Sequence, residues 1–75
     1  MGECVISVRS NTVAERVRRI AAAERIRSEI VSVDPKLTKR GCSVGLRLPC
    51  EDVAALRHIL DRRGITYGDI LGGGV

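Results

Sequence analysis

The chain of 75 residues has very few aromatic side chains, namely one tyrosine and neither tryptophan nor phenylalanine. Proteins that bind single-stranded nucleic acid without sequence preference stack the bases on such rings, and each stack contributes about 1–3 kcal/mol. The net charge of +4 attracts anions in general. Without rings for the bases, this charge argues little for nucleic acid, and we expect no nucleic-acid partner.

Long apolar runs are also missing. No run approaches the ~20 residues that a membrane-spanning helix needs, and the beginning of the chain lacks the apolar region of a secretory signal. The start also lacks the Ser or Thr at position six that N-myristoylation requires, since Ile6 stands there. Three cysteines cannot all pair within one chain. We therefore expect a cytoplasmic protein in a reducing compartment, without a membrane partner.

Groups that bind metals are scarce. The chain has a single histidine, His58, and no pair of cysteines at CxxC spacing. His58 lies off the apolar stripe of its segment, which is typical of a surface residue. The sequence predicts neither a metal site nor a cofactor.

The hydrophobic pattern alternates between the strand period of two and the helix period of 3.6. Ser10-Asn11-Thr12 offers N-cap residues for the first helix, and Thr12 and Glu15 have the spacing of a capping box. Gly64 is a good residue to follow the second helix. The expected elements are strands at 4–8, 30–33, 43–48 and 65–71, and helices from Thr12 to Ala23–Arg25 and at 51–63.

This order, βαββαβ, predicts an α+β fold of the ferredoxin-like type. It is a two-layer sandwich with a four-stranded antiparallel sheet and two helices on one face. Residues 1–71 form a single domain, and residues 72–75 form a flexible, glycine-rich C-terminal tail.

Cys42 is the strongest candidate for a functional residue. It follows Lys39-Arg40-Gly41 and precedes Ser43-Val44-Gly45, and nearby positive charge from Arg40 favours the reactive thiolate. Gly41 and Gly45 allow a tight turn and close approach of a partner. Because Cys42 has the parity of Val44, we expect it on the helix-covered face. It would lie near the start of the first helix, where the amides of Ser10 and Asn11 stabilise negative charge.

The other two cysteines are expected to differ from Cys42 in position and in the partners that they can reach. Cys4 faces the core at the start of the first strand, and Cys50 lies near the start of the second helix. Cys42 and Cys50 are separated by about 26 Å of extended chain at ~3.3 Å per residue, far beyond the ~7 Å between Cα atoms that a disulfide allows. Cys4 and Cys50 can approach each other, because the first strand begins where the third ends. Cys42 is thus left as a single thiol, which suits a carrier better than an oxidoreductase.

The stretch from Val33 to Leu71 resembles a small bacterial and archaeal family of selenium/sulfur carrier-like proteins, and the first strand and helix fit its length and pattern. The family places glycine directly after its cysteine, whereas Ser43 and Val44 stand before Gly45 here. The resemblance implies a carrier, rather than an enzyme, that holds sulfur or selenium on Cys42 as a persulfide. Its partners would be a sulfur donor such as a cysteine desulfurase, and an acceptor enzyme. The matching pieces are Val33-Asp34-Pro35, Gly41 to Arg47, Glu51-Asp52 and Gly64 to Ile70.

An alternative function is a non-catalytic module that binds a protein or a small ligand, since this fold hosts many unrelated functions. In that interpretation the exposed sheet face, lined by Val5, Ser7, Gly45 and Arg47, contacts a partner or a second copy in a homodimer.

Overall fold

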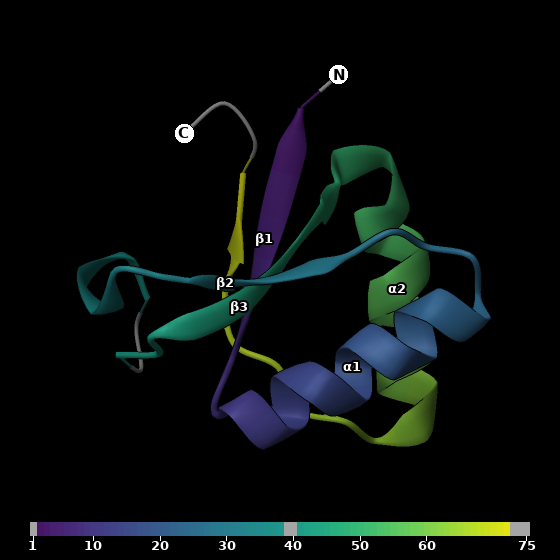
Figure 1. Ribbon diagram of the computed structural model, residues 1–75, viewed down its shortest axis with the longest axis horizontal. Coiled ribbons are helices and arrows are strands. Elements are labelled where there is room, and N and C mark those ends of the chain that lie inside the picture. The colour runs from purple at the N-terminus through teal and green to yellow at the C-terminus, as the bar shows by residue number, and fades with distance from the viewer. Residues whose placement is uncertain (1, 39–40, 73–75) are drawn as a thin grey trace.

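The computed structural model describes residues 2–38 and 41–72. Arg40 and most of the expected C-terminal tail lie outside the described residues. The elements are β1 (Glu3–Val8), α1 (Asn11–Ala23), β2 (Glu29–Ser32), the short 3-10 turn η1 (Pro35–Leu37), β3 (Val44–Pro49), α2 (Cys50–Arg63) and β4 (Ile70–Leu71) (Figure 1).

The four strands form one antiparallel sheet in the order β2-β3-β1-β4. β1 and β3 are central and pair along their whole lengths, with Cys4 opposite Leu48 and Val8 opposite Val44. The element order and the strand order confirm the ferredoxin-like α+β sandwich predicted from the sequence.

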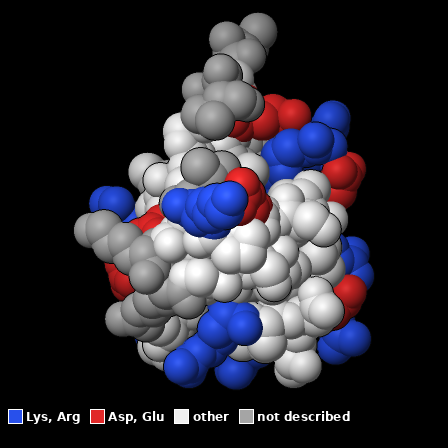
Figure 2. All heavy atoms as spheres, turned by 90° about the vertical axis from the view of Figure 1, so that its left-hand side faces the viewer, with Lys and Arg blue, Asp and Glu red and all other residues white. Residues whose placement is uncertain are grey.

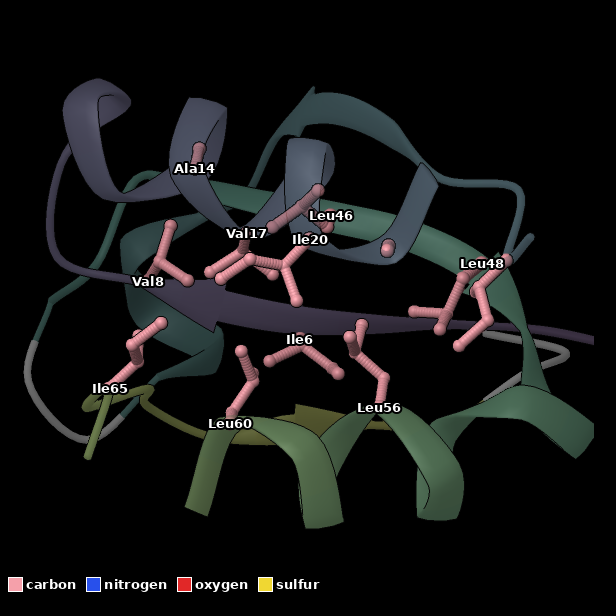
Figure 3. Packing of buried hydrophobic residues seen from close by; sticks show 12 residues of the cluster. Ile6, Val8, Ala14, Val17, Ile20, Leu46, Leu48, Leu56, Leu60 and Ile65 are labelled. Atoms are coloured by element: carbon pink, nitrogen blue, oxygen red, sulfur yellow. The ribbon is translucent and has the colours of Figure 1, made fainter. Parts of the chain in front are cut away.

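Alternation along the central strands sets the two faces of the sheet. Ile6 and Leu46 are fully buried and point toward the helices (Figure 3). Both helices add to the same cluster, α1 with Val17 and α2 with Leu56 and Leu60. One aliphatic core therefore lies between the sheet and the helices. Neither helix is long and apolar enough to cross a membrane, within the part of the chain that the structure describes.

The start of α1 differs from the predicted capping box at Thr12. The helix begins at Asn11, and the N-cap is Ser10, whose hydroxyl accepts a hydrogen bond from the Val13 amide at 3.3 Å. Glu15 forms an ion pair with Arg18 at 3.1 Å instead of turning back to the helix start. The capping box of Thr12 and Glu15 was wrong, whereas Ser10 was one of the N-cap residues that the sequence offered. Both Ser10 and Thr12 suit an N-cap, and the turn after β1 puts Ser10 first.

The fourth strand is much shorter than the predicted 65–71 and has only two residues, Ile70 and Leu71. Before it, Ile65 is buried in the core, and its amide donates to the Leu60 carbonyl at 2.9 Å. This contact ties the chain to the end of α2, where Gly64 adopts the left-handed conformation expected of it (φ 69°). The apolar pattern of this segment therefore reflects core burial after a helix, in addition to pairing in a sheet.

The sheet face away from the helices is partly covered by its own loops. Ser7 is 0 % exposed, and Gly45 is buried. A Cβ atom at Gly45 would stand 2.8 Å from Cγ1 of Val5 and 3.0 Å from Cγ2 of Val33. The prediction that Ser7 and Gly45 line an exposed face was therefore wrong. Parity places a residue on a face, and it does not show which loops fold over that face.

Candidate thiol site

Cys42 lies in the loop between η1 and β3. Hydrogen bonds to residues at most ten positions away in the sequence hold this loop. The Thr38 hydroxyl lies within hydrogen-bond distance of two acceptors, the carbonyl oxygens of Pro35 at 3.3 Å and Cys42 at 3.4 Å. The Val33 amide donates to the Ser43 carbonyl at 2.9 Å. These bonds fix the backbone on both sides of the thiol and set its position relative to β3.

The segment before β4 forms the opposite wall. The Gly68 amide donates to the Ser7 carbonyl at 2.7 Å, and the Ser7 amide donates to the Asp69 carbonyl at 2.9 Å. A Cβ atom at Gly68 would stand 2.5 Å from Oγ of Ser7 and 3.5 Å from Sγ of Cys42. Glycine at 68 therefore allows this segment to lie against Ser7 and beside the thiol.

A pocket of about 230 Å³ opens between these two walls. Cys42 is half-buried, and it is the one cysteine of the chain outside a disulfide. Arg9 is exposed and has no ion-pair partner among the described residues. The thiol thus shares a pocket with a free guanidinium group. The lining residues are Arg9, Gly41, Cys42, Ser43, Thr66, Tyr67 and Gly68.

The structure gives Cys42 different neighbours from those expected. β3 begins only at Val44, so strand parity does not extend to residue 42. The thiol lies near Ser7, which is on the face away from the helices. Ser10 and Asn11 line a second hollow, which adjoins the thiol pocket because Arg9 and Ser43 line both. Its other walls come mainly from β2 and Val33.

Among the other residues proposed from the sequence, Gly41 lies in the pocket beside the thiol, with a positive φ of 68° that favours glycine. Gly45 is buried in the sheet, away from the pocket lining. Arg40 is outside the described residues. The sequence analysis therefore placed one of its proposed neighbours, Gly41, at the site.

Tyr67 links the pocket wall to α2. Its hydroxyl donates to Oδ1 of Asp61 at 3.2 Å. Burial raises the pKa of Tyr67 above its ordinary value of 10.0, the Asp61 carboxylate raises it further, and Arg57 partly opposes the rise. The neutral hydroxyl is thus the favoured form, and it connects the residue beside the pocket to the last turns of the helix.

Five residues of the pocket were not proposed as site residues by the sequence analysis: Arg9, Ser43, Thr66, Tyr67 and Gly68. A signal for Arg9 was present, because the end of β1 must lie beside the start of β3 in this topology. Residues 66–68 belong to a piece that carries the family resemblance, but their strand pattern did not predict that they would lie beside the thiol.

The remaining two cysteines form a disulfide at the other end of β1. Sγ of Cys4 is bonded to Sγ of Cys50, with the Cα atoms 4.9 Å apart. The expectation that these two residues can approach each other is thus confirmed. Within the described residues, 2–38 and 41–72, no group of three or more His, Cys, Asp or Glu side chains is arranged to hold a metal ion.

Figure 2 shows the side of the molecule that lies to the left in Figure 1. Basic and acidic side chains are interspersed there, with an uncharged area between them.

Comparison of the chain with protein-family models, with curated proteins and with solved structures found no match. The class of protein is therefore defined by its fold and its site: a ferredoxin-like domain with one free thiol in a small polar pocket.

Proposed function

We propose that the domain is a carrier of sulfur, or of selenium in the same way, which holds its cargo on Cys42 as a persulfide. The observation that supports this most directly is the free, half-buried thiol in a pocket that also contains Arg9. A pocket of about 230 Å³ is smaller than the ~300–1,000 Å³ of sites for drug-sized ligands. It suits a cargo of one or a few atoms and the side chain that delivers it.

The transfer requires no cofactor. The Cys42 thiolate attacks the outer sulfur of a persulfide on the donor, the donor S–S bond breaks, and the donor cysteine leaves as a thiolate with the bonding electron pair. Delivery is the same exchange in the opposite direction, with an acceptor nucleophile attacking the outer sulfur on Cys42. Each step conserves atoms and electrons, so a single cysteine is sufficient.

Arg9 provides the charge that this chemistry uses. A persulfide at neutral pH carries negative charge on its outer sulfur, and the free guanidinium in the same pocket stabilises that charge. The hydroxyl groups of Ser43 and Thr66 line the same pocket and offer further hydrogen-bond donors. Arg9 therefore has the role of stabilising negative charge on sulfur, which the sequence analysis assigned to Arg40 and the start of α1.

The proposed partners are a persulfide donor such as a cysteine desulfurase and an enzyme that accepts the sulfur, and the proposed location is the cytoplasm. The pocket is open to solvent at the sheet end where β3 begins, so a partner's reactive cysteine has access to it. The interaction module remains the alternative. For that function, Cys42→Ala would leave partner binding intact.

The test is to incubate the protein with a cysteine desulfurase and cysteine, and to map added sulfur by mass spectrometry. We expect one additional sulfur atom on Cys42 and none on the Cys42→Ala variant. Loading no faster than that of an equal concentration of glutathione would overturn the proposal. Selenocysteine in place of cysteine as the desulfurase substrate supplies selenium at the oxidation level of the persulfide, and it distinguishes a selenium carrier from a sulfur carrier.

A matched pair of variants tests the role of Arg9. Arg9→Gln removes the charge beside the thiol, whereas Arg27→Gln removes one from a hollow beside Leu48 and Pro49, at the far end of β3. Two unit charges about 4 Å apart in water interact by ~1 kcal/mol, which sets the scale of the effect expected from a charge in the same pocket. We therefore expect Arg9→Gln to slow loading about fivefold and Arg27→Gln to leave it unchanged. Equal effects would show that only overall charge matters.

A further inference from the structure

The Cys4–Cys50 disulfide lies outside the thiol site, and its two sulfur atoms have different surroundings. Cys4 is 8 % exposed and faces the core from β1, whereas Cys50 is half-exposed at the beginning of α2. We propose that this is a redox-active disulfide. A small thiol or dithiol opens it by attacking Sγ of Cys50 while the domain remains folded.

Exposure decides which sulfur reacts, because the rate of exchange depends on access to the attacked atom. The incoming thiolate bonds to Sγ of Cys50, the Cys4–Cys50 bond breaks, and Cys4 leaves as a thiolate that takes a proton from solvent. A second thiol then attacks the incoming sulfur of the mixed disulfide and releases the Cys50 thiolate. In total, two thiols are oxidised to one disulfide and the protein disulfide is reduced to two thiols.

The position of Cys50 favours its release as a thiolate. It is the first residue of α2, and Pro49 provides no side-chain hydrogen bond to the helix start. The free amides and the dipole of a first helical turn stabilise an anion there. Glu51 and Asp52 oppose this effect, since both are acids in the same turn. Exposure therefore selects Cys50 as the sulfur that is attacked in the first step. Helix position favours release of the Cys50 thiolate in the second step, and the two acids limit how far its reduced form is favoured.

The contacts around the disulfide do not depend on it. β1 and β3 are paired along six residues each, and α2 is anchored by Leu56 and Leu60, which are fully buried. The Cys50 amide also donates to the Gly2 carbonyl at 3.1 Å. The elements that the disulfide joins are thus held together by other means, so the bond can open without unfolding of the domain.

The disulfide is separate from the thiol site. Cys4 lies opposite Leu48, and Val8 lies opposite Val44 at the other end of the same ladder. The five residue steps from Val44 to Pro49 span about 16 Å of strand. Cys42 therefore cannot exchange with Cys50 in the same molecule. The inference stands whether or not Cys42 carries sulfur, and in the proposed reducing location the bond would open and close.

The experiment uses the Cys42→Ala variant in native buffer, so that only the disulfide can react. The protein is exposed to increasing concentrations of glutathione or dithiothreitol, quenched by alkylation and analysed by mass spectrometry. We expect the opening rate to rise in proportion to thiol concentration, and the trapped glutathione adduct to map to Cys50. A rate that does not depend on thiol and increases with urea would show that the bond opens only from the unfolded chain, and would overturn the proposal.

Two further measurements test the folded state and the choice of sulfur. Circular dichroism of the reduced protein should retain the signal of the oxidised protein at low temperature, and loss of that signal would contradict the proposal. Glutathione disulfide should modify Cys50 in Cys4→Ala on the order of tenfold faster than Cys4 in Cys50→Ala. Equal rates would contradict the assignment of Cys50. The opening kinetics of Cys42→Ala, described above, do not require Cys4→Ala or Cys50→Ala to fold.

Discussion

The two ends of the central strand pair place cysteine in opposite situations. Where β1 begins and β3 ends, Cys4 and Cys50 are joined, and the bond connects the sheet to α2. Where β1 ends and β3 begins, Cys42 is unpaired between two loops and shares its pocket with Arg9. The comparison shows how one antiparallel ladder separates a covalent link between two elements from a single free thiol, because it keeps the third cysteine out of reach of the other two.

The largest effect should come from removing the covalent link. The disulfide connects residues 46 apart in the sequence, and loop-closure entropy for that length corresponds to about 4 kcal/mol. We expect Cys4→Ala/Cys50→Ala to lose about this much free energy of unfolding in urea titrations. Cys42→Ala, at a half-buried position in a loop, should lose only about 0.5 kcal/mol. Equal losses of free energy of unfolding in the two variants would contradict the difference between the two ends of the strand pair.

An intermediate effect is expected at Gly68. An added methyl group would meet Oγ of Ser7 at 2.5 Å and approach Sγ of Cys42 at 3.5 Å. Gly68→Ala should therefore cost about 1–3 kcal/mol by overpacking, and it should slow alkylation of Cys42 by narrowing the pocket.

Gly72→Ala is the matched control for this variant, because nothing lies within 4 Å of its Cβ position. The Cys4–Cys50 bond should open at the same rate in both variants. Faster opening in Gly68→Ala alone would show that the two ends are coupled.

The smallest effect concerns pH. Since folding raises the pKa of Tyr67, the folded state favours the neutral hydroxyl. The contribution of this pKa shift to the free energy of unfolding is fully present below pH ~10. It is lost as pH rises through the raised pKa of Tyr67. Asp61→Asn should lower this pKa toward its ordinary value and leave the contribution of burial. The chain has one tyrosine and no tryptophan, so an ultraviolet absorbance titration reports Tyr67 directly. An unchanged midpoint in Asp61→Asn would contradict the role of Asp61.

The sequence was sufficient for the fold because each element has a local cause. Alternation at Cys4, Ile6 and Val8 determines which face of β1 is buried, and Gly64 ends α2 because it adopts a conformation that other residues rarely take. The errors fell where several residues satisfy the same local rule. Ser10 and Thr12 both suit an N-cap, and an apolar segment after a helix suits either a strand or a buried loop, as at Ile65.

The sequence by itself determined that Cys42 would be unpaired and that Cys4 and Cys50 could meet, since strand order and distance along the chain fix both. Only the tertiary structure decided what surrounds the thiol. It brought Arg9 and Gly68 to the pocket of Cys42 and left Ser10 in the adjoining hollow, outside that pocket's lining. The physical reason is that strand parity ends where the strand ends. Before Val44, the thiol's surroundings are set by loop contacts such as those of Ser7 with Gly68 and Asp69, which join residues distant in the sequence.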